Sequence, residues 1–373
     1  MIFDNYSAEE ADVLIAKMQA SHGNFTPFKG IKDADELISI AKARAKAKKK
    51  TSYKNLFFTE EDLRFATPEV VAEYRAERLQ CKTLVDIGCS IGLQTFAFAR
   101  HCNKVIAIEI DERKIAYAKQ NAKKLDIKNI EFIHGDALEP KIIQQIHEAE
   151  IVFSDTERLP EEKSRSLDRV NPNIGEVLRK YGHLTEDFCF EIPASIGFVD
   201  ISGEKEYLDI DKKLNRLNLY RGSLQKTDTV VVSLPSAQKL EGKQDYHYET
   251  SSPLDSYIGV VSTAVVKAGL VSELIKKAGA SIYAPVKIFL VTAKEPTQSE
   301  FINWFLVLGT AENEIELREK LKGNTAGKVI LRFSIEDKEY WDERMKLQKG
   351  LDGNETIYLF KKEKFILAKK IES

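Results

Sequence analysis

The stretch that most constrains this chain is T-L-V-D-I-G-C-S-I-G, residues 83–92. Its apolar run predicts a buried parallel strand that stops at Asp86, because strands covered on both faces have few polar positions. Gly88 and Gly92 then enclose a tight turn, and the apolar segment 93–99 predicts a helix. Glycines let the backbone turn sharply and approach a ligand, while the free N–H groups of a helix start favour polar or anionic groups. This order of elements predicts a site for a nucleotide-like cofactor.

Two more predicted strands bring carboxylates to the same edge of the sheet. The strand over 104–110, K-V-I-A-I-E-I, contains Glu109. It follows the first glycine by about 20 residues, the interval at which an acidic residue reaches a ribose hydroxyl in dinucleotide-binding folds. A helix over 111–125 comes next, and a third strand over 130–133 runs into Asp136. Since the carboxyl ends of parallel strands share one edge, three loops at that edge carry acidic side chains.

The glycine-rich turn is also compatible with a purely structural role. A lone G-x-x-x-G turn arises from close packing of a strand against a helix. A nicotinamide enzyme more often carries G-x-G-x-x-G, and a nucleotide hydrolase needs a G-K-S or G-K-T sequence, which this chain lacks. Three acidic loops in this order favour a nucleoside-containing cofactor over packing alone.

The sequences D-I-G-C-S-I-G, I-E-I-D and H-G-D-A-L, in this order and spacing, resemble those of class I S-adenosylmethionine-dependent methyltransferases. The resemblance implies a Rossmann-like α/β fold with S-adenosyl-L-methionine as its cofactor. It also implies that the first loop holds the methionyl part, that the acidic residue of the second strand binds the ribose hydroxyls and that the third loop binds the adenine amino group. Ser90 stands where the family usually has the middle glycine of G-x-G. The implied cofactor-binding residues are Asp86, Gly88, Ser90, Gly92, Glu109, Asp136 and Ala137.

The composition limits the class of protein. With 373 residues, 43% hydrophobic and 31% charged, the chain is expected to form two or three domains. The formal net charge of −2 means that a nucleic-acid partner must meet a local basic patch. No stretch approaches 18 uninterrupted apolar residues and residues 1–5 lack a signal-peptide pattern, so a cytoplasmic protein without membrane contact is expected. The four cysteines form no C-x-x-C and accompany no clustered histidines, which predicts free thiols and no metal site.

Residues 1–80 are predicted to form an N-terminal helical region. Ser7, followed by two glutamates, is positioned to start the first helix. Thr59 and Thr67 each precede acidic residues and are predicted to cap two later helices. One face of the last helix carries two arginines, Arg75 and Arg78.

A helix predicted over 33–50 ends in the most basic run of the chain, A-K-A-R-A-K-A-K-K-K. Such a run is usually the solvated face of a helix. The alternative is an arm that contacts RNA phosphates. On that interpretation the predicted RNA-binding residues are Lys42, Arg44, Lys46, Lys48, Lys49, Lys50 and, after the fourth strand, Arg158.

The loop after the predicted fourth strand, 150–155, is the candidate catalytic segment. In class I methyltransferases that act on exocyclic amines this loop commonly reads [DNS]-P-P-[FYW], whereas this chain has S-D-T-E-R. It is more similar to the D-P-A-R-like loop of the group with a C-terminal THUMP-like domain, with Thr156 in place of the proline and a basic loop over 165–172 after it. The resemblance implies that Asp155 accepts a hydrogen bond from the target amine. The alternative is that Asp155 only caps a turn at the strand end.

A fifth strand over 188–192 and an antiparallel pair over 214–220 and 229–234 are expected to complete the sheet. The methyltransferase domain is therefore predicted to span 81–235. A polar segment over 236–252 without periodicity is predicted to be a linker.

The C-terminal segment 253–373 is predicted to be a separate α+β domain. It resembles the THUMP-like domain in A-V-V-K-A-G-L-V, A-G-K-V-I-L-R, E-Y-W-D-E-R and Y-L-F-K-K-E-K-F-I-L-A-K-K-I. The predicted helices cover 259–267, 271–278, 313–322 and 338–349, and the predicted strands cover 286–292, 304–308, 328–333, 356–360 and 364–368.

THUMP domains are associated with RNA modification, so the resemblance implies an RNA substrate, either tRNA or rRNA. The family-level expectation is methylation of an exocyclic base nitrogen, guanine N2. The target base must then be unpaired or flipped into a pocket. Two other classes stay open: a protein that binds cofactor or RNA on this scaffold without transfer, and a methyltransferase that acts on a protein or a small molecule.

Overall fold

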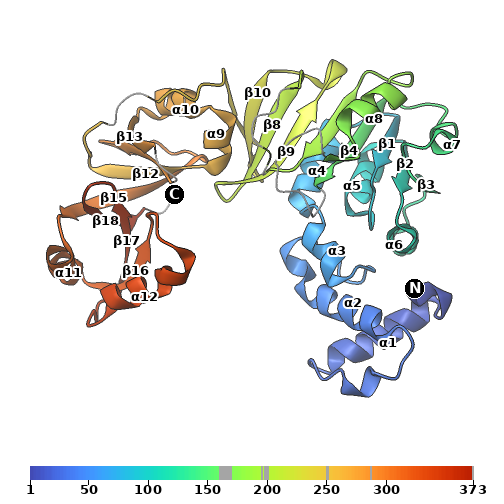
Figure 1. Ribbon diagram of the computed structural model, residues 1–373, viewed down its shortest axis with the longest axis horizontal. Coiled ribbons are helices and arrows are strands. Elements are labelled where there is room, and N and C mark those ends of the chain that lie inside the picture. Colours follow the sequence, from blue (N-terminus) through green and yellow to red (C-terminus); the bar gives the residue numbers. More distant parts are fainter. Residues whose placement is uncertain (159–169, 195, 197–200, 249–251, 286–287, 372–373) are drawn as a thin grey trace. The chain divides into compact units, whose positions relative to one another are not determined.

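The computed structural model in Figure 1 describes residues 1–158, 170–194, 196, 201–248, 252–285 and 288–371. The chain forms two compact units, which are described separately below. The first consists of Met1–Lys205 and Arg216–Lys226, and the second of Glu206–Asn215 and Thr227–Ser373. Within the described ranges, none of the helices combines the length and the apolar character that a membrane span requires.

The first unit begins with the predicted helical region. Ser7 caps α1 through a capping box with Glu10, and Thr59 caps α3 in the same way with Asp62, so both predicted starts are confirmed. Thr67 does not cap α4, because the residue before the helix is Pro68. The helices are α1 Ala8–Ala20, α2 Ala34–Lys46, α3 Glu60–Phe65 and α4 Glu69–Arg78, with short 3-10 helices η1 Ile2–Asp4, η2 Thr26–Phe28 and η3 Ala47–Lys49.

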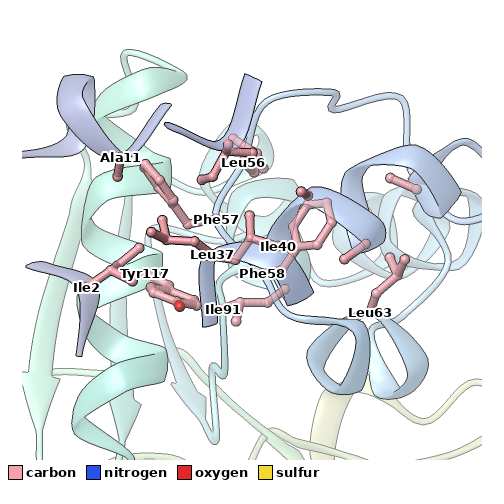
Figure 2. Packing of buried hydrophobic residues seen from close by; sticks show 14 of the residues in the cluster. Ile2, Ala11, Leu37, Ile40, Leu56, Phe57, Phe58, Leu63, Ile91 and Tyr117 are labelled. Atoms are coloured by element: carbon pink, nitrogen blue, oxygen red, sulfur yellow. The ribbon is translucent and has the colours of Figure 1, made fainter. Parts of the chain in front are cut away.

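One apolar core joins these helices to the sheet that follows. Figure 2 shows Phe57, Leu37 and Ile2 packed around Tyr117, which belongs to α6 Glu112–Lys124. Asn121 of the same helix fastens this contact, since its amide oxygen accepts from the Phe57 N–H at 2.7 Å. The boundary predicted at residue 80 therefore lies inside one compact unit.

The sheet of the first unit has five parallel strands in the order β7-β4-β1-β2-β3. This order confirms the predicted Rossmann-like α/β fold, and residues 217–220 of β9 pair antiparallel with β7. The strands are β1 Thr83–Ile87, β2 Lys104–Glu109, β3 Ile130–His134, β4 Ile151–Asp155, β7 Phe188–Ile192 and β9 Lys213–Tyr220, with a small ladder of β5 Glu157–Arg158 and β6 Val170–Asn171. The helices are α5 Leu93–His101, α6, α7 Pro140–Ile143, α8 Ile174–Tyr181 and the 3-10 turn Gly222–Leu224.

The second unit is an α+β arrangement. Strand β10 Thr229–Leu234 has β8 Glu204–Ile210 and β11 Gln238–Glu241 as neighbours, and a seven-stranded sheet follows in the order β13-β14-β12-β15-β18-β17-β16. Its strands are β12 Tyr257–Val261, β13 Ser281–Pro285, β14 Phe289–Ala293, β15 Ile302–Ala311, β16 Ala326–Leu331, β17 Glu355–Lys361 and β18 Phe365–Lys370. Its helices are α9 Thr263–Ala268, α10 Val271–Ala278, α11 Glu314–Gly323 and α12 Asp337–Gln348.

Several details of this half differ from the prediction. The helix predicted over 259–267 is wrong at its start, because Tyr257–Val261 forms the strand β12. Gly259 lies where an added Cβ would approach Ile302, Trp304 and Val291 within 2.8 Å, so its close neighbours come from paired strands. Strands β8 and β13 were not predicted, β9 is not the neighbour of β10, and β11 lies within the segment predicted as a linker.

Candidate functional site

A cavity of about 310 Å³ opens at the carboxyl ends of β1, β2 and β4. From β1 the chain continues to β2 on one side of it, while β4 lies on the other side, and open α/β sheets bind ligands at such a reversal of strand order. A wider hollow of about 590 Å³ beside α7 and α8 contains none of the predicted site residues. The cavity is lined by Phe65, Ala66, Thr67, Asp86, Gly88, Cys89, Ser90, Ile91, Leu93, Gln94, Glu109, Ile110, Asp111, Lys114, Phe153, Asp155, Asn171 and Pro172.

The glycine-rich turn has the backbone that its sequence predicts. Gly88 and Gly92 have φ of +80° and +91°, which glycine adopts without strain. At Gly92 an added Cβ would also lie 2.5 Å from the ring of Phe96. Ser90, in place of the usual glycine, also has a positive φ of 50°. The turn therefore keeps its left-handed conformation despite the serine.

Glu109 holds this turn to the second loop. One of its carboxylate oxygens accepts from the Ser90 N–H at 2.7 Å, and the other accepts from the Asp111 N–H at 2.9 Å. The side chain is buried but lines the cavity. Each carboxylate oxygen has a second lone pair, so Glu109 can brace the two loops and still accept hydrogen bonds from a ligand.

Asp86 is the buried acid at the end of β1. Its carboxylate accepts from the Thr95 hydroxyl at 2.6 Å. Burial raises the pKa of Asp86 to about 7, opposed by the Thr95 hydrogen bond and by the positive charge of Arg75. A carboxyl with this pKa is partly protonated near neutral pH, and a cationic ligand group in the cavity favours its ionised form.

The third predicted loop lies at the same sheet edge but outside the cavity lining. A side-chain oxygen of Asp136 accepts from the Leu138 N–H at 2.8 Å, and the Ala137 carbonyl accepts from the Tyr181 hydroxyl at 2.8 Å. Strand β3 is in register with β2, with Glu109 opposite His134, so Asp136 lies two residues beyond that pair. Of the predicted cofactor residues, the cavity brings together Asp86, Gly88, Ser90 and Glu109, whereas Gly92, Asp136 and Ala137 lie outside its lining.

The end of β4 brings the predicted catalytic aspartate to the same cavity. Asp155 is half-buried and lines it together with Asn171 and Pro172. The short ladder of β5 with β6 brings these two residues back toward the strand end. Arg165–Arg169 of the predicted basic loop lie outside the described residues.

Thr156, which replaces the expected proline, is buried and hydrogen-bonded. Its hydroxyl donates to the Glu191 carbonyl at 2.6 Å, and its N–H points to the same oxygen at 3.2 Å. Glu191 is the β7 residue in register with Asp155. The hydrogen bonds of Thr156 therefore fix the backbone after Asp155, as the ring of a proline would restrict it.

A buried polar network lies around the first of the two arginines of α4. Arg75 is fully buried, and its guanidinium donates to the Gln94 amide at 2.7 Å, to the Asn218 amide at 2.9 Å and to the Glu191 carboxylate. Gln94 in turn lines the cavity. The spacing of Arg75 and Arg78 places them on one helix face but gives no sign of their partners, which come from α5, from the 3-10 turn Gly222–Leu224 and from strands more than 100 residues away.

Two exposed apolar side chains at the cavity were also missed. Ile110, directly after Glu109, is 66% exposed, and Phe65 at the end of α3 is 57% exposed. Apolar faces at a polar cavity suit flat ring systems. The sequence could have indicated Ile110, because it is the last residue of K-V-I-A-I-E-I and follows Glu109. Phe65 belongs to no ligand-binding motif, so the sequence does not indicate its position.

The basic run divides between the interior and the solvent. Arg44 is buried, donating to the Leu56 carbonyl at 2.9 Å, the Asn55 carbonyl at 3.1 Å and Asp12 at 2.8 Å, so its predicted contact with RNA is wrong. Lys50 donates inward to two carbonyls of the α3 end. Three lysines are exposed, namely Lys42, Lys46 and Lys48, while the side chains of Lys49 and Arg158 lie outside the described part.

Comparison with known proteins agrees with this geometry. Residues 80–239 match a family model described as "Methyltransferase domain". Two curated relatives, uncharacterised S-adenosylmethionine-dependent methyltransferases from Mycobacterium tuberculosis strains CDC 1551 and H37Rv, are each 28% identical over 124 residues, 33% of this chain and 33% of each relative. The chain thus spans about a third of the length of the curated relatives it matches.

A solved structure shares the fold of nearly the whole chain. The crystal structure of a candidate methyltransferase from Porphyromonas gingivalis W83 superimposes with a TM-score of 0.73, at 15% identity, over 98% of this chain and 100% of that one. Residues 80–239 thus match the methyltransferase-domain model, and their strand order is that of a Rossmann-like α/β fold.

Proposed function

We propose that this protein transfers a methyl group from S-adenosylmethionine to an exocyclic nitrogen of an RNA base, with guanine N2 the atom that the sequence resemblance favours. The observation that carries the proposal is the cavity that gathers Asp86, Ser90 and Glu109 with Asp155. The first three belong to the loops expected to hold the cofactor. Asp155 is the group expected to meet the target amine.

The cofactor is S-adenosylmethionine, and each part of it has a matching group in the site. The free lone pairs of Glu109 accept from the ribose hydroxyls. Asp86 attracts the cationic amino group of the methionyl part, and the exposed face of Ile110 covers one side of the adenine ring. Asp136 and Ala137, which follow β3 at the same sheet edge but outside the cavity lining, are the groups we assign to the adenine end.

The sulfonium of the cofactor supplies an activated methyl group, so the chain has mainly to position the acceptor. Asp155 accepts a hydrogen bond from the target amine and aligns the nitrogen lone pair with the methyl carbon. A target amine that accepted the methyl group would carry positive charge until it lost a proton. The carboxylate at the cavity stabilises that charge until the proton leaves.

The exposed lysines Lys42, Lys46 and Lys48 and the α+β second unit support an RNA substrate. The C-terminal segment resembles the THUMP-like domain, which is associated with RNA modification. Lysines on a solvent-facing helix can follow phosphates without reading the base sequence. RNA recognition by shape would then bring an unpaired base to the cavity.

A scaffold without transfer activity is the second candidate function, and the loop after β4 favours it. Thr156 replaces the expected proline, and the described part of this loop, Thr156–Arg158, contains no aromatic side chain. Such a protein binds cofactor and RNA but transfers no methyl group.

The test compares the wild type with Asp155→Ala and Asp155→Asn. Transfer of tritiated methyl to RNA from a strain that lacks the protein is measured together with the affinity for S-adenosylhomocysteine. We expect Asp155→Ala to lower transfer on the order of a hundredfold at unchanged cofactor affinity, and Asn to retain more activity because its amide oxygen still accepts. Binding of both ligands by a wild type that transfers nothing would favour the scaffold.

A further inference from the structure

Phe65 is exposed at a place where folding alone does not explain it. Its side chain is 57% exposed and lines the cavity that contains Asp155. Burying a phenylalanine is favourable, so a ring left open at a cavity wall is available for a ligand. The guanidinium carbon of Arg64 lies 4.4 Å from the ring centroid. The Arg64 guanidinium thus lies over the Phe65 ring and adds a cation to this part of the wall.

The chain on both sides of Phe65 is held firmly. Leu63, two residues earlier, is buried in the core of Figure 2. The Lys50 ammonium donates to the Arg64 carbonyl at 2.5 Å and to the Ala66 carbonyl at 2.9 Å, which flank Phe65 in sequence. The helix ends at Phe65, since Ala66 already leaves the helical conformation, and Pro68 restricts Thr67 to an extended conformation. The ring is therefore presented by a fixed backbone.

We propose that Phe65 forms the stacking wall of a subsite for a flat nucleobase, and that Lys50 is its positioning residue. The inference rests on the proposed RNA methyltransferase function and supplies the aromatic group missing from S-D-T-E-R. In related methyltransferases that act on exocyclic amines, the aromatic follows the fourth strand. Here the ring comes from α3, which is distant in sequence from Asp155, and the two side chains line the same cavity.

The chemistry of this wall fits a base rather than a phosphate. Bases stack on aromatic faces and on arginine planes whatever their sequence, because each base has a π-face. Asp155 on the same cavity provides the acceptor for an exocyclic amine. Together they select a planar ring that carries an N–H donor, which guanine, adenine and cytosine share.

The first test is a series at position 65. Phe65→Ala should lower kcat/KM for RNA by about 5- to 150-fold, the loss expected for one stacked base, without changing the affinity for S-adenosylhomocysteine. Phe65→Tyr should keep most of the activity because it keeps the ring, whereas Phe65→Leu should not. Val13→Ala removes another exposed apolar side chain from the N-terminal region and is the matched control.

Two results would overturn this assignment. If Phe65→Ala lowered the affinity for S-adenosylhomocysteine as much as kcat/KM for RNA, the ring would contact the cofactor and not the base. If kcat/KM for RNA stayed unchanged, Phe65 would not stack on the target base. If the wild type methylates no RNA, the proposed function fails, but the subsite is still decided by saturation-transfer NMR with guanosine. Contact of guanosine with the cofactor-loaded wild type that disappears in Phe65→Ala supports the subsite, and equal or no contact in both excludes it.

The role of Lys50 is tested by a double-mutant cycle. Lys50→Met keeps the alkyl stem and removes the donors, so kcat/KM for RNA should fall several-fold in the wild type and stay unchanged in a Phe65→Ala background. The exposed Lys54→Met provides the charge control. Additive effects of Lys50→Met and Phe65→Ala would show that Lys50 acts independently of the ring.

Discussion

The glycine-rich loop and the basic run are both recognisable segments of about ten residues, yet the fold treats them differently. In the loop, predicted residues such as Asp86 and Ser90 line one cavity. In the run, Arg44 points into the core, Lys50 turns back to α3, and only the remaining described lysines face solvent. A motif of backbone turns places its residues reliably, whereas a run of like charges does not.

The physical reason lies in what fixes each residue. A strand end followed by glycines at positive φ leaves the backbone few alternatives, so position follows from local sequence. A cation on a helix takes whichever acceptor the tertiary structure offers. Arg44 binds Asp12 and the carbonyls of residues 55 and 56, none of which the run itself contains.

The largest effect that would test the difference between the loop and the run is expected for the stability of the protein on substitution of Arg44. Arg44→Met leaves the buried Leu56 carbonyl without its donor and removes one of the two cations, Arg44 and Lys124, that donate to Asp12 and to the Asn55 carbonyl. We expect the free energy of unfolding to fall by about 2 to 4 kcal/mol. Lys42→Met, an exposed neighbour on the same helix, should change it by less than about 0.5 kcal/mol. Urea titration measures both, and equal effects would show that the run is uniform after all.

The loop half of the comparison is tested at Glu109. Glu109→Ala removes the brace between Ser90 and Asp111 as well as the acceptors for the ribose, so the affinity for S-adenosylhomocysteine should fall by about 1.5 to 3 kcal/mol. That loss is roughly tenfold to more than a hundredfold in calorimetry. Glu112→Ala, an exposed acid three residues later, controls for charge alone. Unchanged affinity in a folded Glu109→Ala would exclude the ribose contact.

Much of the fold was predictable because local patterns agree with the tertiary structure. The five parallel strands read as apolar runs, and Ser7 and Thr59 carry capping boxes that need only three following residues. The helix prediction started too early because Y-I-G-V-V of β12 lies only two residues before A-V-V of α9. The N-cap Ser262 between them separates strand from helix, and Gly259 pairs with β14 and β15. Strand β8 was not predicted because buried acids, including Glu206 and Asp209, interrupt its apolar pattern.

The site was predictable only where its residues follow strand ends. Asp86, Glu109 and Asp155 each lie at the end of a parallel strand, and parallel strands share one carboxyl edge. The partners of Arg75 could not be found in this way, since Glu191 and Asn218 lie more than 100 residues away in sequence. Phe65 reaches the cavity through the packing of α3, which the local sequence does not encode.

A smaller effect follows from the buried carboxyl of the loop. The pKa of Asp86 is raised by burial to about 7, above its unfolded value of 3.8. The folded protein therefore holds the proton more tightly between about pH 4 and 7, and the unliganded fold loses stability as the pH rises through this range.

The binding affinity follows the opposite trend, because the amino group of the ligand attracts the ionised form of Asp86. We expect the affinity for S-adenosylhomocysteine to rise up to about tenfold from pH 6 to pH 8. Asp86→Asn should flatten this dependence, and Glu109→Gln should not. A wild-type affinity that stays constant over the range would separate Asp86 from the ligand charge.

The smallest effect is expected from the exposed lysines of the run. If Lys42, Lys46 and Lys48 contact RNA phosphates, the logarithm of the RNA association constant should depend less steeply on the logarithm of the salt concentration once all three are replaced with glutamine. We expect the slope to decrease in magnitude by about 2 to 3. At about 0.6 M salt, where little of the counterion-release contribution remains, the affinity should fall only a few-fold. Preference among RNA sequences should not change, because phosphate contacts carry no base information.

The control for this experiment removes three exposed lysines elsewhere on the chain. Lys54, Lys277 and Lys294 are exposed and lie outside the run, so their triple replacement changes the net charge equally. A flatter salt slope in the first variant alone assigns the phosphate contacts to the run. An identical salt slope in both variants would mean that these lysines form only a solvated helix face. The exposed side of the run would then contribute no more to RNA binding than the buried Arg44 does.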